Sequence, residues 1–109
     1  LGALSEGDIG KHFPDTNEKY KGIDSKELLL EVVEILHKKG FEINNIDVTV
    51  LLQRPKLRNH IDEMIETLSA VMKIDKKKLS IKATTTEGLG FVGREEGVAA
   101  HCVTLINKI

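Results

Sequence analysis

The sequence has few aromatic residues, one cysteine and no tryptophan, and these shortages disfavour several classes of protein. Aromatic residues make up 4% of the 109 residues, which disfavours an RNA-binding α/β module because such modules stack bases on an aromatic-studded strand. The lone Cys102 excludes an internal disulfide and fits a reducing compartment, so we expect a cytoplasmic protein. Because Cys102 lies in an apolar segment, we expect it to be a small, buried hydrophobic residue.

Long apolar runs and an excess of charge are also missing. No apolar run approaches the ~18 residues of a membrane span, and we recognise no signal peptide. Sixteen basic and seventeen acidic residues nearly cancel, so no overall field would draw the chain to nucleic acid or to a membrane. The one basic run, Lys76-Lys77-Lys78, is typical of a solvated turn before a strand, with an anion site as the alternative.

The chain is short enough for one domain, residues 1–109, with two helices predicted by apolar residues at helical spacing. One helix begins after Asp24 or Ser25 and ends near Lys39, where Gly40 supplies a stop. The other covers 60–72. Strands are predicted at 46–53, 79–84 and 98–106, and 5–22 is expected to be a long loop.

These elements predict an α/β fold, an α+β sandwich in which helices pack on one face of a mixed sheet. The last strand is apolar on both faces apart from His101 and Thr104. A strand of that kind needs cover on both sides. Helices can cover one side, and in a chain this short another subunit can cover the other.

The most informative stretch is 82–97, which holds three adjacent threonines followed by the carboxylate of Glu87, and also four glycines and an arginine, between two apolar runs. Threonine hydroxyls and glycine-permitted backbone N–H groups can surround phosphate oxygens, and Glu87 can hold a divalent cation against them. Arg94 can fork onto an anion. The alternative is a glycine-rich loop between two strands, with threonines present for their β propensity.

The order of these residues resembles the signature of the 2-C-methyl-D-erythritol 2,4-cyclodiphosphate synthase family of the non-mevalonate isoprenoid pathway. Two further segments, 7–16 and 47–56, resemble the same family in the same order, so the resemblance covers nearly the whole chain. It implies that residues 1–109 form the C-terminal part of a cyclodiphosphate synthase domain. The implied activity, a phosphorus–oxygen lyase, converts 4-diphosphocytidyl-2-C-methyl-D-erythritol 2-phosphate to the cyclic diphosphate and releases CMP.

The resemblance also implies roles for the threonine stretch. Thr85 would be catalytic, donating its hydroxyl to the phosphate where charge develops. Glu87 would hold a magnesium or manganese ion that bridges the α- and β-phosphates, and without the flanking pattern it would be an exposed loop glutamate. Thr84 and Thr86 would complete the phosphate cradle.

Two further segments, both earlier in the sequence than that cradle, are implied to bind the substrate. The cytidine pocket would contain Leu52, Gln53, Arg54, Pro55, Lys56, Leu57 and Arg58. Lys56 would meet the α-phosphate, although alone it would be an ordinary surface lysine. The methylerythritol-binding loop would contain Asp8, Ile9, Gly10, Phe13, Pro14, Asp15, Thr16 and Asn17. Arg54 and Asn17 stand where the family commonly has a small residue and an aspartate, and Asp15 could instead cap its own turn.

In the family, this loop faces the cytidine pocket of a neighbouring subunit, so the resemblance implies a homotrimer with active sites between protomers. Phe91 and Arg94, with Glu96, match a position lining a central channel that can hold isoprenoid diphosphates. A surface ion pair between Arg94 and Glu95 or Glu96 is the alternative.

The chain opens at Leu1 without methionine, whereas members of the resembled family have a preceding segment whose Asp-x-His pair and further His hold a zinc ion. His12, His37, His60 and His101 lack metal-ligand spacing, so we expect the zinc ligands in that segment. A catalytically silent trimer that binds a cytidine nucleotide or an isoprenoid diphosphate is the alternative function. A fusion to a cytidylyltransferase also stays open.

Overall fold

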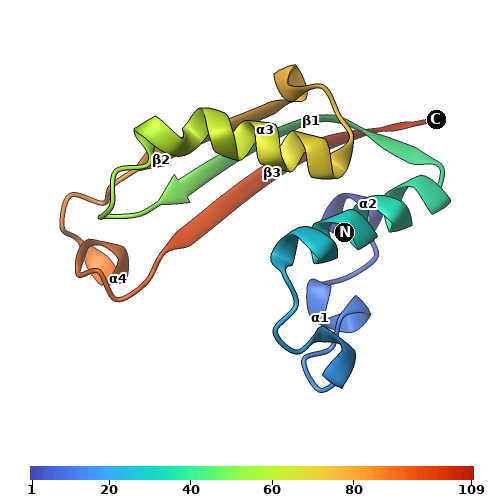
Figure 1. Ribbon diagram of the computed structural model, residues 1–109, viewed down its shortest axis with the longest axis horizontal. Helices are drawn as coiled ribbons and strands as arrows, with labels where there is room; N and C mark the ends of the chain where they lie inside the picture. The colour runs from blue at the N-terminus through green and yellow to red at the C-terminus, as the bar shows by residue number, and fades with distance from the viewer.

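The computed structural model describes residues 1–109, and its centre is a three-stranded mixed sheet with the strand order β2-β1-β3. The central strand β1 (Phe41–Leu51) pairs in parallel with β2 (Leu79–Thr84) and antiparallel with β3 (Ala99–Lys108). The register sets Leu51 beside Thr84, so β1 and β2 end next to each other at the same end of the sheet (Figure 1).

The two long helices are α2 (Ser25–Lys38) and α3 (Ile61–Met72), close to the ranges predicted from the sequence. Asp24 caps α2, since its side chain accepts a hydrogen bond from the backbone N–H of Lys26 at 2.8 Å. Gly40, with φ of +83°, follows the end of α2 in the left-handed region, where glycine is favoured.

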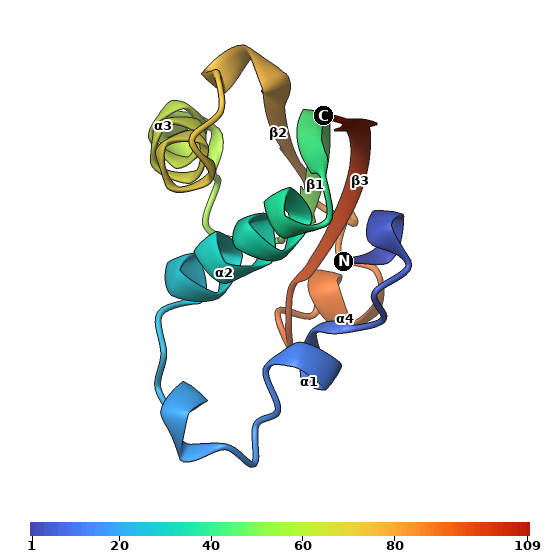
Figure 2. The same ribbon diagram turned by 90° about the vertical axis from the view of Figure 1, so that its right-hand side faces the viewer.

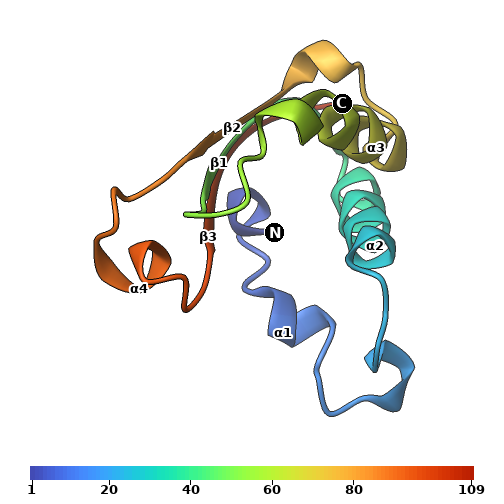
Figure 3. The ribbon, with the colours of Figure 1, turned by 60° about the vertical axis from the view of Figure 1, so that its left-hand side comes forward.

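Both helices lie on the same side of the sheet, which confirms the predicted layering (Figure 3). The buried core between them and the sheet consists of seven residues: Val33, Leu36, Ile43, Ile46, Met72, Leu79 and Ile81. No helix covers the opposite face of the sheet. That face carries an exposed ion pair between Lys82 on β2 and Asp47 on β1. The register partner of Lys82 is Thr49, so the pair runs diagonally to a residue two positions earlier on β1.

β1 begins at Phe41, five residues before the predicted start of this strand, and ends at Leu51 rather than Gln53. The register with β3 shifts between Ile43 and Asn45. Such an irregularity interrupts the alternation of apolar and polar residues on which the prediction relied. The first part of β1 was therefore missed.

β3 is an edge strand, and several of its apolar side chains are open to solvent. Val103 is 74% exposed and Leu105 58% exposed. The expectation that Cys102 is buried was wrong, because it is exposed and lines an apolar hollow of about 610 Å³ between β3, α2 and the N-terminal turn. The hollow leaves no packed layer over Cys102.

The segment predicted as a long loop contains two short turns, α1 (Ile9–His12) and the 3₁₀ turn Glu18–Tyr20. Figure 2 shows this segment extending away from the sheet before it enters α2. Glu6 and Lys39 form an ion pair of 2.7 Å that connects its beginning to the end of α2. Lys76–Lys78 is a 3₁₀ turn directly before β2, as expected. None of the helices has the length and apolarity that a membrane crossing requires.

Candidate functional site

A cavity of about 380 Å³ lies at the C-terminal ends of β1 and β2. The backbone N–H of Leu52 donates to the carbonyl of Thr84 at 3.0 Å, which extends the ladder by one residue and holds the two strand ends together. The cavity is lined by nine residues: Leu52, Pro55, Lys56, Leu57, Arg58, Ile61, Ala83, Thr84 and Thr85. It therefore brings together two segments that the sequence separates by about thirty residues.

Five of the seven residues predicted for the cytidine pocket line this cavity, and two do not. Gln53 and Arg54 instead line a smaller hollow of about 160 Å³ beside the loop that follows β2. Sequence reasoning missed Ile61 and Ala83. Ile61 falls in the helix predicted at 60–72 and Ala83 in the strand predicted at 79–84, and neither apolar side chain carries a polar signal.

The cavity is rich in positive charge. Lys56 and Arg58 both line it, and neither takes part in any of the five ion pairs of the structure. No acidic residue lines the cavity. Two unpaired cations beside threonine hydroxyls suit a ligand that carries phosphate groups.

The three threonines after β2 use their hydroxyl groups differently. Thr84 donates to the carbonyl of Thr85 at 3.1 Å, and Thr86 donates to the carbonyl of Leu89 at 2.6 Å. Short hydroxyl side chains in turns often satisfy nearby backbone in this way. The Thr85 oxygen accepts from the backbone N–H of Glu87 at 3.2 Å. Of the three hydroxyl protons, the one on Thr85 is thus free to donate to a ligand.

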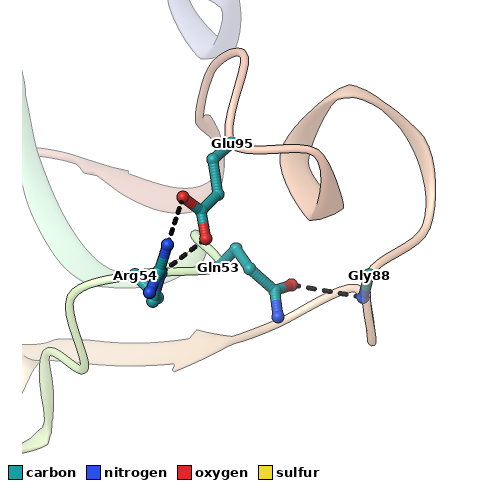
Figure 4. Close-up of polar contacts among 4 residues, drawn as sticks. All are labelled: Gln53, Arg54, Gly88 and Glu95. Atoms are coloured by element: carbon teal, nitrogen blue, oxygen red, sulfur yellow. Dashed lines mark hydrogen bonds and ion pairs between the residues drawn. The ribbon is translucent and has the colours of Figure 1, made fainter.

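Glu87 is exposed and forms no ion pair, so its carboxylate is available. Its φ is +54°, and Gly88 follows with φ of +79°, so the backbone turns through the left-handed region at both residues. That conformation is costly for a residue with a side chain. The backbone N–H of Gly88 donates to the Gln53 side chain at 3.3 Å, which holds the turn against the end of β1 (Figure 4).

A second contact connects the same two segments. Arg54 donates through Nε and Nη2 to the two carboxylate oxygens of Glu95, at 2.5 and 2.8 Å (Figure 4). The hydrogen bond from Arg54 lowers the pKa of Glu95, and the same bond raises the pKa of Arg54.

Phe91 and Arg94 lie on and just after the short helix α4 (Gly90–Gly93). Phe91 is 51% exposed, and Arg94 pairs with Glu96 at 2.9 Å. Of the two surface pairs considered from the sequence, Arg94–Glu96 is the one that forms, while Glu95 pairs with Arg54. An anion at Arg94 would have to compete with the Glu96 carboxylate.

None of the predicted loop residues 8–17 lines the cavity. Asp8 accepts from the backbone N–H of Lys11 at 2.9 Å, and Asn17 accepts from that of Lys19 at 3.0 Å, so both act as local caps. Phe13 is buried against the edge of the Tyr20 ring. Asp15 makes no side-chain hydrogen bond to its own turn, which leaves its carboxylate free. Within one chain, this loop and the cavity remain apart.

No group of three or more His, Cys, Asp or Glu side chains lies close enough together to hold a metal ion. The residues of this chain therefore do not fit a resident zinc ion. A single carboxylate such as Glu87 fits magnesium only when ligand oxygens and water complete the coordination shell.

Comparison with known proteins places the chain in a family. Residues 1–107 match the YgbB family. A 2-C-methyl-D-erythritol 2,4-cyclodiphosphate synthase of Brachyspira hyodysenteriae is 54% identical over 108 residues, which are 99% of this chain and 68% of that protein.

Two solved structures superpose closely. The bifunctional IspDF of Campylobacter jejuni gives a TM-score of 0.96 at 39% identity, and covers 100% of this chain with 30% of its own length. The CDP complex of IspF from Plasmodium falciparum gives a TM-score of 0.86 at 31% identity, covering 99% of this chain with 64% of its own. The chain therefore belongs to the YgbB family, together with relatives that are 2-C-methyl-D-erythritol 2,4-cyclodiphosphate synthases.

Proposed function

We propose that the chain is the nucleotide- and phosphate-binding part of a 2-C-methyl-D-erythritol 2,4-cyclodiphosphate synthase. The observation that carries this proposal is the cavity at the C-terminal ends of β1 and β2, where Lys56 and Arg58 lie unpaired beside Thr85. A relative with the same fold is known as a CDP complex. CDP carries a cytosine ring and two phosphates, so it matches both the apolar and the cationic parts of the cavity wall.

In the proposed reaction, the 2-phosphate oxygen of the substrate attacks the β-phosphorus of the diphosphate at the other end of the same molecule. The bond between the β-phosphorus and the oxygen bridging it to the α-phosphate breaks, and CMP leaves with the bonding electron pair. No covalent intermediate with the protein is required, so the protein contributes by positioning the substrate and stabilising charge.

Five polar residues in and beside the cavity have roles in that scheme. Lys56 neutralises the α-phosphate as a point charge, while Thr85 donates its free hydroxyl proton to the phosphate where charge develops. Glu87 would hold a magnesium or manganese ion, which would neutralise negative charge on the phosphates when bound. Because Thr84 and Thr86 already donate to the backbone, they shape the turn rather than donate to the phosphate.

We further propose a homotrimer whose active sites lie between subunits. The methylerythritol-binding residues 8–17 and the cavity do not meet within one chain, so a neighbouring chain would have to supply that loop. The exposed Val103 and Leu105 on the edge strand offer an apolar surface for such a contact. Because Cys102 is a free thiol, a reducing, cytoplasmic compartment stays our expectation.

An assay of CMP release tests the proposed function. The 109-residue chain and a longer chimaera that carries the N-terminal segment of a curated relative are each incubated with the substrate, zinc and magnesium. We expect the chimaera to release CMP and the 109-residue chain to bind CDP without turnover, since the zinc ligands are expected in the added segment. Loss of an electrophilic metal is worth on the order of a thousandfold in rate.

Comparable CMP release from both proteins would show that catalysis does not need zinc ligands from the added segment. Binding of CDP by both proteins without CMP release from either would instead support a silent binder. A chimaera that neither binds CDP nor releases CMP would overturn the proposed function.

A further inference from the structure

Two adjacent residues beyond the end of β1 reach across to two different points of the loop at 85–97. The Gln53 side chain accepts from the backbone N–H of Gly88, and the Arg54 guanidinium donates twice to Glu95 (Figure 4). These four residues are called the clasp below. Together they join parts of the chain that lie 35 and 41 residues apart in sequence.

The clasp is the polar connection between the loop and the cavity-lining segment. Of the five ion pairs, Arg54–Glu95 is the one that joins this loop to another part of the chain, because Arg94–Glu96 lies within the loop. Its two parallel N–H···O bonds fix direction as well as distance, which a single lysine contact would not do.

Both anchor points in the loop have an unusual backbone. Glu95 has φ of +63° and Gly88 has φ of +79°, and Glu87, next to Gly88, has φ of +54°. A left-handed non-glycine residue persists only where its surroundings hold it. The clasp supplies such a hold at each end of the loop.

The position of the clasp gives it a consequence for binding. Lys56 lies two residues after Arg54, and Glu87 directly precedes Gly88. Together with the β1–β2 pairing, the clasp therefore helps to set the distance between the Lys56 ammonium and the Glu87 carboxylate. Under the function proposed above, on which this inference rests, these two groups contact the same diphosphate, one directly and one through a metal ion.

We propose that the clasp is a positioning device that couples nucleotide binding to metal binding, so that magnesium tightens CDP more strongly while Gln53 and Arg54 hold the loop. Arg54 and Glu95 act through Lys56 and Glu87 and need not touch the ligand. An intact clasp presents both groups at the spacing of one diphosphate. A loosened clasp leaves each group competent alone but poorly matched to the other.

The coupling is measured by calorimetric titration of CDP, with and without saturating magnesium, into the wild-type chain and five variants. These are Arg54→Ala, Glu95→Ala, their double variant, Arg54→Lys and Glu95→Gln. The factor by which magnesium tightens CDP should fall about two- to fivefold in each alanine variant, the scale of a well-formed exposed pair. The double variant should lose no more than either single variant. Arg54→Lys, which keeps the charge but not the fork, should recover only part of the loss.

The direction in which each single variant changes CDP binding distinguishes the clasp from a general effect of charge. If the residues acted only through their fields, removing Arg54 would weaken CDP and removing Glu95 would strengthen it. The clasp requires that Arg54→Ala and Glu95→Ala both reduce the factor by which magnesium tightens CDP. Glu95→Gln, which keeps the shape of the side chain, must show the same loss as Glu95→Ala.

Lys26→Ala is the matched control, because Lys26 and Asp24 form an ion pair of similar exposure at the start of α2, within one segment. It should leave the coupling unchanged. The inference would be overturned if Arg54→Ala and Glu95→Ala changed the tightening of CDP by magnesium in opposite directions, or if their losses added in the double variant. Either result would leave the proposed function standing. A wild-type chain that does not bind CDP overturns the proposed function itself.

Discussion

Gly93 packs so closely against the backbone of Gly88 that there is no room for a side chain on Gly93. A Cβ atom on Gly93 would lie 2.0 Å from the carbonyl carbon of Gly88 and 2.6 Å from its Cα and oxygen. Backbone cannot move aside as a flexible side chain can. The contact holds α4 against the turn that carries Glu87.

Gly93→Ala should therefore displace that turn. We expect it to reduce CDP and magnesium binding and to lower the free energy of unfolding by about 1 to 3 kcal/mol, as overpacking does. Calorimetry measures the first effect and thermal denaturation the second. Gly2→Ala is the control, because a Cβ there would meet nothing within 4 Å. Wild-type binding by Gly93→Ala would show that the turn tolerates movement.

Glu87→Gln should weaken magnesium binding while the cytidine nucleotide still binds. The substitution removes the charge of a carboxylate that forms no ion pair, and it keeps the shape of the side chain. In the catalytically complete enzyme, we expect turnover to fall by about three orders of magnitude, the scale of a lost electrostatic stabiliser. Titrations of CDP and magnesium test the assignment, with the exposed Glu34→Gln on α2 as a control. An unchanged magnesium dependence would remove Glu87 from the metal site.

The Arg54–Glu95 pair should stabilise the fold in a pH-dependent manner. Because Arg54 lowers the pKa of Glu95 below its usual value of 4.5, the folded state favours the charged carboxylate. The stabilisation is then fully present above pH 4.5 and is lost as the pH falls through the lowered value.

The melting temperature of the wild type relative to Glu95→Gln measures this contribution. The difference should be constant between about pH 7 and pH 5, and should shrink at lower pH. Added salt should also reduce it, because the pair is exposed. A difference that grew towards acid pH would contradict the sign of the effect.

Association through the edge strand is a fourth expectation. Val103 and Leu105 are more than half exposed in the single chain, and burying them against a neighbour would stabilise a trimer. Light scattering at micromolar concentration should report a trimer for the wild type and smaller species for Val103→Asp. A monomeric wild type would rule out an active site shared between subunits of this chain.

The features that local sequence patterns encode could be predicted. Asp24 and Gly40 bracket α2 because a cap and a left-handed stop act within a few residues of the chain. The segment 52–58 and Thr85 were expected to share a site. The parallel register of β1 and β2 brings Thr85 and five of those seven residues to one cavity, while Gln53 and Arg54 lie outside it.

Features that depend on distant partners could not be predicted in the same way. Many acidic residues are candidates to pair with Arg54, and nothing local distinguishes Glu95, which lies 41 residues away. Cys102 was expected in a packed interior because its neighbours are apolar. Its exposure depends on what covers the edge strand, and the sequence around Cys102 does not encode that cover.

The most direct test of the account is whether the cavity binds CDP through Lys56. Calorimetric titration of CDP into the wild-type chain with magnesium present should give saturable binding with one site per chain. Lys56→Ala should weaken that binding by about tenfold, the scale of one lost charge-assisted contact. The Lys26→Ala control should bind as the wild type does. Absence of CDP binding at millimolar ligand, or equal affinity in Lys56→Ala, would contradict the assignment of this cavity as the nucleotide site.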